Sequence, residues 1–185
     1  VYELKELLEG AKINKIYNPE PTILTMRVHI RNFGQKELFF DLKKGFWISK
    51  YRMNYPTVPS NFAMKMRKHL SNGIIERIEQ IKTDRVLRMD IFSKEKYHVY
   101  FEMFRDGNII LTDENDFIIY AMHFEEWSTR KIYPKEIYLP PPSCNLDKET
   151  IMEKILGRDK EIVRVLASEI GFGGTYAEEI CKRAD

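Results

Sequence analysis

The sequence predicts an α+β protein in which an antiparallel β-sandwich is followed by a small helical domain. Three observations support this fold class. Apolar residues recur with a period of two between residues 11 and 121, a proline-rich segment follows, and the period becomes 3.6 beyond residue 145. We therefore expect a β-sandwich domain over residues 1–126, a linker over residues 127–145 and a helical domain over residues 146–185.

The β-rich part contains short runs of alternating or apolar residues that predict strands. Turn residues separate them, and Asp106-Gly107 lies between two runs at hairpin spacing. Eight short strands joined by turns are typical of an antiparallel sandwich or barrel. The predicted strands are Ile23–Ile30, Glu37–Leu42, Phe46–Ser49, Ile74–Ile81, Arg85–Phe92, Tyr97–Phe104, Asn108–Thr112 and Phe117–Ala121.

Two helices are predicted within this domain. Residues 2–9 are typical of the last turns of an amphipathic helix, and Gly10 follows as its C-terminal glycine. A second helix is expected to begin after the N-cap Ser60 and to stop at Gly73. Its apolar stripe is Phe62, Met66 and Leu70.

The C-terminal segment predicts three short helices. Pro134 and the triplet at 140–142 indicate an extended linker before them. The first two helices end at Gly157 and Gly171, and a capping box at residues 175–178 opens the third. The glycine-rich run 171–174 has neither a Walker nor a dinucleotide-binding spacing, so it predicts a tight turn. Because the first and third helical patterns meet the chain ends, we expect residues beyond both ends.

The composition excludes several classes of site. The chain has two cysteines and four scattered histidines, which argues against a disulfide framework or a zinc site. No run approaches the roughly 20 apolar residues that cross a membrane. We therefore expect a cytoplasmic protein with no cofactor, no metal, no membrane partner and no small-molecule substrate.

Positive charge is concentrated between residues 42 and 88. This segment has eleven Lys and Arg against three acids, a net charge of +8 in a chain whose total is +2. Such a segment indicates contact with a polyanion, although a solvated lysine-rich surface has the same composition. Aromatic residues interleave with the basic ones, which suits base stacking and equally suits a half-buried strand with a charged edge. The candidate phosphate contacts are Lys43, Lys44, Lys50, Arg52, Lys65, Arg67, Lys68 and Arg88.

Two short motifs lie at the predicted strand ends. Asp84-Arg85 opens a strand inside the basic segment, where the aspartate could hold the arginine while leaving donors free for phosphate. Ordinary loop chemistry would also account for it. Glu102-Met103-Phe104 ends a strand, and by itself this motif indicates alternating burial. No nucleophile–base set or acid/base pair can be identified from spacing.

Five runs in series resemble the N-terminal module of the NFACT family, the RqcH-like and NEMF-like ribosome quality control proteins that are also labelled fibronectin-binding. The resemblance covers essentially the whole chain. The runs are Glu37–Ser49 (ELFFDLKKGFWIS), Pro59–Leu70 (PSNFAMKMRKHL), Gln80–Val86 (QIKTDRV), Phe101–Asp113 (FEMFRDGNIILTD) and Gly174–Ala184 (GTYAEEICKRA).

The resemblance implies a fold similar to the N-terminal domain of MutM-type glycosylases, followed by a helix–two-turn–helix domain. It implies that the protein binds the large ribosomal subunit that carries peptidyl-tRNA, and that it contacts both tRNA and rRNA there. It also implies that the protein recruits tRNA for template-free C-terminal tailing of stalled nascent chains. The ribosome would perform that chemistry, so no catalytic residue is expected. The implied tRNA-binding residues are Asp84, Arg85, Glu102, Met103 and Phe104. Phe104 departs from the glycine that is more familiar after Glu-x-Met.

Two other functions remain as alternatives. A DNA glycosylase or lyase of the MutM type would use an N-terminal proline followed by glutamate, whereas this sequence starts Val1-Tyr2-Glu3 and has no zinc-finger cysteines. An adhesin is the other alternative, and the low cysteine content gives it little support.

Overall fold

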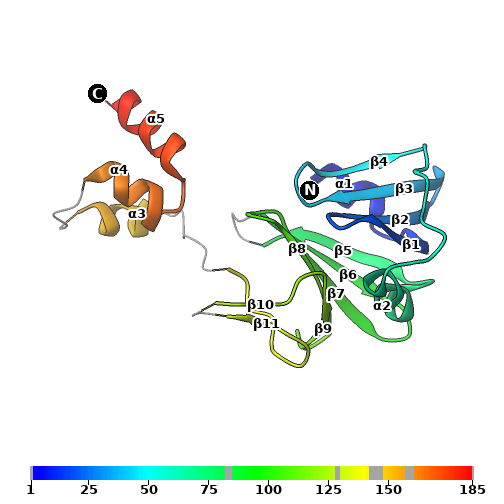
Figure 1. Cartoon of the computed structure of the whole chain (residues 1–185). Helices are drawn as coiled ribbons and strands as arrows, with labels where there is room; N and C mark the ends of the chain where they lie inside the picture. The colour runs from blue at the N-terminus through cyan, green and yellow to red at the C-terminus, as the bar shows by residue number, and fades with distance from the viewer. Residues whose placement is uncertain (1, 82–84, 128–129, 142–147, 157–160, 185) are drawn as a thin grey trace. The chain divides into compact units, whose positions relative to one another are not determined.

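The computed structural model describes residues 2–81, 85–127, 130–141, 148–156 and 161–184. The chain divides into two compact units, each of which is described by itself (Figure 1). The first contains Val1–Ile81 and Arg85–Leu139, and the second contains Pro140–Asp185.

The first unit is built on one antiparallel sheet, so the predicted α+β class is confirmed. Nine of the strands in the described residues form this sheet, in the order β4-β3-β2-β1-β5-β6-β7-β8-β9. The eight predicted strands are present with small shifts at their ends, and β1 is additional. The strands are β1 (Lys12–Glu20), β2 (Ile23–Ile30), β3 (Gly34–Asp41), β4 (Gly45–Ser49), β5 (Ile74–Gln80), β6 (Val86–Phe92), β7 (Lys96–Glu102), β8 (Asn108–Asp113) and β9 (Ile118–Ala121).

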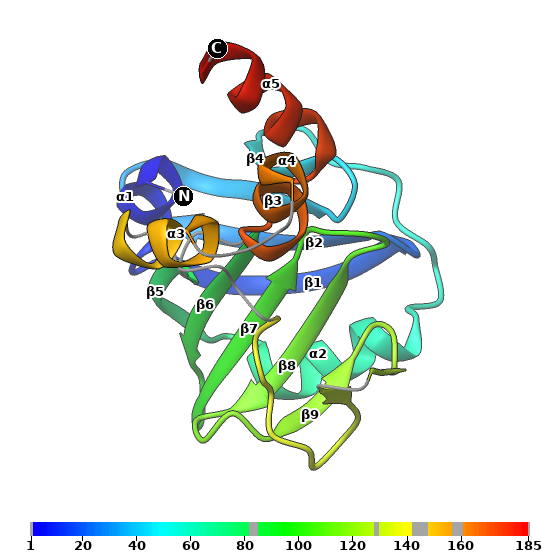
Figure 2. The same cartoon turned by 90° about the vertical axis from the view of Figure 1, so that its left-hand side faces the viewer.

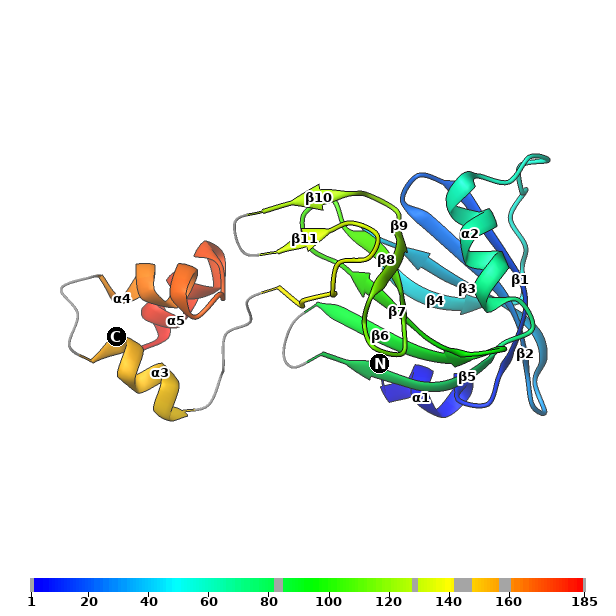
Figure 3. The same cartoon turned by 90° about the horizontal axis from the view of Figure 1, so that it is seen from below.

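The sheet folds so that its two halves, β1–β4 and β5–β9, face one another (Figures 2 and 3). The two halves are joined where β1 pairs with β5, and the register partners there are Lys12 and Ile74. Phe40 in β3 stacks on Phe101 in β7 with ring centroids 4.0 Å apart. Both rings belong to the main hydrophobic core, to which both halves contribute. A sandwich-like core is thus enclosed by one continuous sheet.

Helix α1 (Tyr2–Leu8) packs against β5 through its buried leucines. Gly10, which follows it, has a positive φ of 86°, as expected for a helix C-terminal glycine.

Helix α2 (Asn61–Leu70) packs against β1 and β9. The Ser60 hydroxyl accepts a hydrogen bond from the Ala63 amide at 3.1 Å, which confirms the predicted N-cap. The left-handed residue after the helix is Asn72 (φ 62°) instead of Gly73. Gly73 meets a different requirement, since a Cβ there would come within 2.7 Å of the Ile91 side chain.

The first unit extends further along the chain than the sequence predicted. Residues 130–139, expected to lie in the linker, include β11 (Lys131–Ile132), which pairs with β10 (Glu125–Glu126). The side chains of Ile132 and Tyr138 are buried. The prolines indicated a linker. The segment instead packs on the first unit, because Arg130 and Tyr138 donate hydrogen bonds to a buried carboxylate in the sheet, as described below.

The second unit contains α3 (Lys148–Ile155), α4 (Ile162–Arg164), a π-helix η1 (Val165–Glu169) and α5 (Gly174–Ala184). Its small core is centred on Val165, Leu166, Ile170 and Ala177. Positive φ angles at Gly171 and Gly173 confirm the tight turn before α5. The second predicted helix, expected to end at Gly171, is not one continuous α-helix, because the π-helix η1 follows α4. The likeness to MutM-type proteins and to a helix–two-turn–helix domain stays a prediction.

Candidate nucleic-acid interface

Several turns meet at one end of the first unit, which we call the turn end. It comprises the β3–β4 turn (residues 42–44), Arg85 at the start of β6, and the β7–β8 turn (residues 103–107). The Met103 amide donates to the Arg85 carbonyl at 2.8 Å. Gly107 lies so close to Leu42 that an added Cβ would come within 2.6 Å of the leucine Cβ. The turn end thus brings Arg85, the Glu102-Met103-Phe104 motif, Lys43 and Lys44 together.

Glu102, the last residue of β7, is the centre of a buried polar network. Only 1% of its surface is exposed. The Arg130 guanidinium donates to both carboxylate oxygens, at 2.5 and 2.8 Å, and the Tyr138 hydroxyl donates at 2.9 Å. Arg130 also donates to the Leu139 carbonyl at 3.1 Å. Glu102 is therefore placed to hold residues 130–139 against the sheet.

The hydrogen bonds of this network stabilise the charged form of the Arg130 guanidinium. Burial lowers the pKa of Arg130, but the hydrogen bonds and charge of Glu102 outweigh it and the net shift is upward. Burial, followed by the charge of Glu102, raises the pKa of the Tyr138 hydroxyl, which therefore remains a donor. Burial and the same carboxylate raise the pKa of Glu125.

Aromatic rings cover the outer side of the network. The Arg130 guanidinium carbon lies 4.6 Å from the Trp127 ring centroid and 5.8 Å from that of Phe104. Phe104 is half-buried in this cluster, and Met103 is half-buried against the main core. Arg85 is exposed. Of the four tRNA-binding candidates that the structure describes, Arg85 is therefore the exposed one. Asp84 lies outside the described residues.

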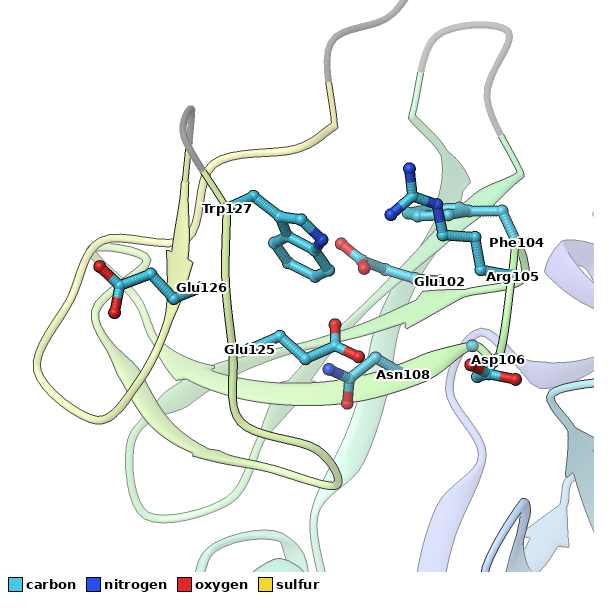
Figure 4. Close-up of a pocket in the computed structure, with 9 residues that line it drawn as sticks. Glu102, Phe104, Arg105, Asp106, Asn108, Glu125, Glu126 and Trp127 are labelled. Atoms are coloured by element: carbon cyan, nitrogen blue, oxygen red, sulfur yellow. The ribbon is translucent and has the colours of Figure 1, made fainter.

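A pocket of about 290 Å³ opens beside the network (Figure 4). Carboxylates outnumber cations on its walls, so it offers hydrogen-bond acceptors and repels phosphate. Its lining residues are Glu102, Phe104, Arg105, Asp106, Gly107, Asn108, Glu125, Glu126 and Trp127.

The remaining basic candidates do not join this surface. Lys50 and Arg52 follow β4 at the strand end away from the β3–β4 turn. Lys65, Arg67 and Lys68 lie on α2, and Arg67 is bound to the sheet through the Ile16 carbonyl at 2.6 Å. Arg88, in the middle of β6, pairs with Asp90 at 2.6 Å. The basic segment is thus divided among separate surfaces.

Sequence reasoning missed Arg130, Tyr138 and Trp127, because they lie in the predicted linker and only tertiary contacts bring them to Glu102. Across the described ranges, no three His, Cys, Asp or Glu side chains gather to hold a metal ion. No helix there is long and apolar enough to span a membrane.

The comparisons with known proteins agree with one another. The family model described as NFACT N-terminal and middle domains matches residues 1–185. The archaeal Rqc2 homolog aRqcH of Methanocaldococcus jannaschii is 34% identical, over 100% of this chain and 30% of that protein. The human ribosome quality control complex subunit NEMF is 27% identical, over 95% of this chain and 17% of that protein. The chain thus spans less than a third of these curated relatives.

Among solved structures, the N-terminal domain of the fibronectin-binding protein PavA from Streptococcus pneumoniae has a TM-score of 0.76 at 25% identity. That match covers 97% of this chain and 74% of the PavA chain. A match of the family model to every residue, together with a 34% identical relative aligned over the whole chain, shows that this chain belongs to the NFACT family.

Proposed function

We propose that the chain is an RNA-binding module of a ribosome-associated quality control factor. In this proposal the turn end contacts tRNA on the large ribosomal subunit, with rRNA nearby, during template-free extension of a stalled chain. Support comes from family membership and from the quality-control names of the relatives. The chain would bind and orient the RNA, and peptide-bond formation would be the ribosome's chemistry.

The exposed position of Arg85 within the turn end is the observation that carries the proposal. The Met103 amide donates a hydrogen bond to the Arg85 carbonyl, which fixes the Arg85 backbone at the end of the sheet. The side chain therefore extends from a defined backbone position. Lys43 and Lys44 are exposed on a neighbouring turn, where the Asp41 carboxylate accepts from both of their backbone amides. These three cations suit phosphate contact. Glu102, Met103 and Phe104 would position this surface from behind.

Binding of fluorescently labelled tRNA to Arg85→Ala tests the assignment. We expect weaker binding and a salt dependence reduced by about one phosphate contact. Arg31→Ala is the matched control, because Arg31 is an exposed arginine in the β2–β3 turn, at the end of β3 opposite to the β3–β4 turn. In the full-length protein, tail formation should follow the same order. Equal tRNA affinity for both variants would remove Arg85 from the interface.

Fibronectin binding is a second candidate, favoured by the names of the structural relatives. The Streptococcus suis relative, named a fibronectin/fibrinogen-binding protein, also has a TM-score of 0.76, at 27% identity. Immobilised fibronectin separates the two candidates. Saturable fibronectin binding that Arg85→Ala leaves unchanged, without tRNA binding, would favour this second function.

A further inference from the structure

A row of side chains, three aromatic and one threonine, crosses the outer face of the first half-sheet, away from the core. Tyr17, Thr25, Phe39 and Trp47 are successive register partners from β1 to β4. Their neighbours along β2 and β3, including Leu24, point into the core instead. Phe39 and Trp47 stack with centroids 5.3 Å apart and planes within 2° of parallel. Phe39 is only 4% exposed, so Trp47, at 41%, presents the more exposed ring of this pair.

The segment after β4 adds a second layer of rings. Tyr55 stacks on Tyr17 with centroids 3.8 Å apart, and its hydroxyl donates to Glu37 at 2.7 Å. Tyr51 is 72% exposed, and the Lys50 ammonium lies 5.5 Å from its ring centroid. The outer layer is thus anchored at Tyr55 and open at Tyr51.

Cations surround these rings. The Arg27 and Arg67 guanidinium carbons lie 5.7 and 5.0 Å from the Tyr17 ring centroid. Lys15 is exposed beside Arg27, its register partner, and the Arg52 side chain is 60% exposed. Glu37 lies among them, but it is buried and accepts from Arg27 at 2.6 Å. Its negative charge is therefore neutralised, and the face remains positive.

The rings and cations on this face do more than hold the segment after β4 in place. Tyr55, Tyr17 and Glu37 are in mutual contact and suffice to hold it. Trp47, 41% exposed, borders a hollow that residues of α1 also line, and Tyr51, 72% exposed, lies beside Lys50, so both rings are open to solvent. Stacked rings beside lysine and arginine are the combination that binds unpaired nucleic acid without sequence preference.

We propose that the outer face of β1–β4, with residues 50–55, binds a single-stranded segment of RNA. Bases stack on Trp47 and Tyr51, while Lys15, Lys50 and Arg52 contact phosphates. This site is separate from the turn end, since Lys50 and Arg52 lie at the opposite end of β4 from Lys43 and Lys44. The choice of RNA as polyanion rests on the proposed function, whereas the site itself rests on the rings and cations described.

Binding of a labelled oligouridylate of about 12 nucleotides to the full chain tests the proposal. Tyr51→Ala is expected to weaken binding roughly 5-fold to 150-fold, the range for loss of one base stack. Tyr176→Ala is the matched control, because Tyr176 in the second unit is 71% exposed. Trp47→Leu removes the ring but keeps Phe39 covered, and the oligouridylate-induced quenching of tryptophan fluorescence should disappear with it.

The outcomes separate this site from the turn end. Arg85→Ala should weaken tRNA binding and leave oligouridylate binding intact, and Tyr51→Ala should weaken oligouridylate binding whether or not the tRNA assignment holds. Unchanged oligouridylate affinity in folded Tyr51→Ala and Trp47→Leu would overturn the proposal. Persistent quenching in Trp47→Leu would also overturn it, as would displacement of oligouridylate by polyglutamate at equal charge concentration, which would indicate an acidic protein partner.

Discussion

Arg130→Met tests the buried network at the turn end. The substitution removes both hydrogen bonds that the guanidinium donates to Glu102. Among the described residues, the carboxylate, which is 1% exposed, keeps the hydrogen bond from the Tyr138 hydroxyl. Methionine keeps an apolar chain of similar length between Trp127 and Phe104. The perturbation therefore keeps apolar packing but removes the charge pair, the hydrogen bond to the Leu139 carbonyl and the cation–π contacts together.

The expected cost is a large fraction of the stability. Removing one partner of a buried ion pair costs about 3–5 kcal/mol, against a total of roughly 5–15 kcal/mol for a typical domain. Glu102→Gln should be costly for the reciprocal reason, because it leaves Arg130 buried beside a neutral amide. In the double variant no unpaired charge remains. Its cost should fall below the sum of the two single variants by about 2–3 kcal/mol.

Urea unfolding followed by tryptophan fluorescence measures these costs. Both tryptophans of the chain, Trp47 and Trp127, lie in the first unit, so the signal reports on that unit. A cost below about 1 kcal/mol for Arg130→Met would refute the reasoning. Additive costs in the double variant would show that Glu102 and Arg130 are not energetically coupled.

Three further outcomes are expected from the same unfolding assay. Gly107→Ala should be more destabilising than Gly10→Ala, because both have positive φ but only Gly107 faces a side chain within 3 Å; equal costs would contradict the close contact. Burial raises the pKa of Asp90, but hydrogen bonds from His98 and Arg88 outweigh it and the net shift is downward. Asp90 should therefore stabilise the fold above about pH 3.9 and lose that effect as pH falls through its folded pKa, a loss absent in Asp90→Asn. Burial and a neighbouring carboxylate raise the pKa of Glu125, so Glu125→Gln should be more stable than the wild type at neutral pH and equal to it at about pH 3. A constant difference at all pH values would contradict this.

The strands could be predicted because most carry their own signal. Alternation in Ile23–Ile30 follows directly from one buried and one outer face. Strand β1 was missed because register shifts interrupt its pairing with β2 between Ile13 and Lys15 and between Tyr17 and Glu20. A bulge moves later side chains to the other face, so a simple period of two is lost.

The candidate site was predictable only in part. The sequence placed Arg85 and Glu102 at strand ends, and pairing of β6 with β7 then brings Val86 opposite Glu102. The burial of Glu102 could not be predicted, because its partners Arg130 and Tyr138 lie 28 and 36 residues further along the chain. The sequence likewise could not show that the basic residues lie on different surfaces. Residues that are close in sequence are separated in space, because some lie on α2 and others lie at opposite ends of β4.

The strand order also has a consequence for folding kinetics. Strands β1–β4 form one meander and β5–β9 another, and sheet neighbours are consecutive in sequence except at the β1–β5 junction. Hairpins within each meander close short loops, whereas the junction and the Phe40–Phe101 stack bring together residues about 60 apart. We expect the rate-limiting step of folding to be the docking of two largely formed meanders. The refolding rate should then respond most strongly to changes along this single seam.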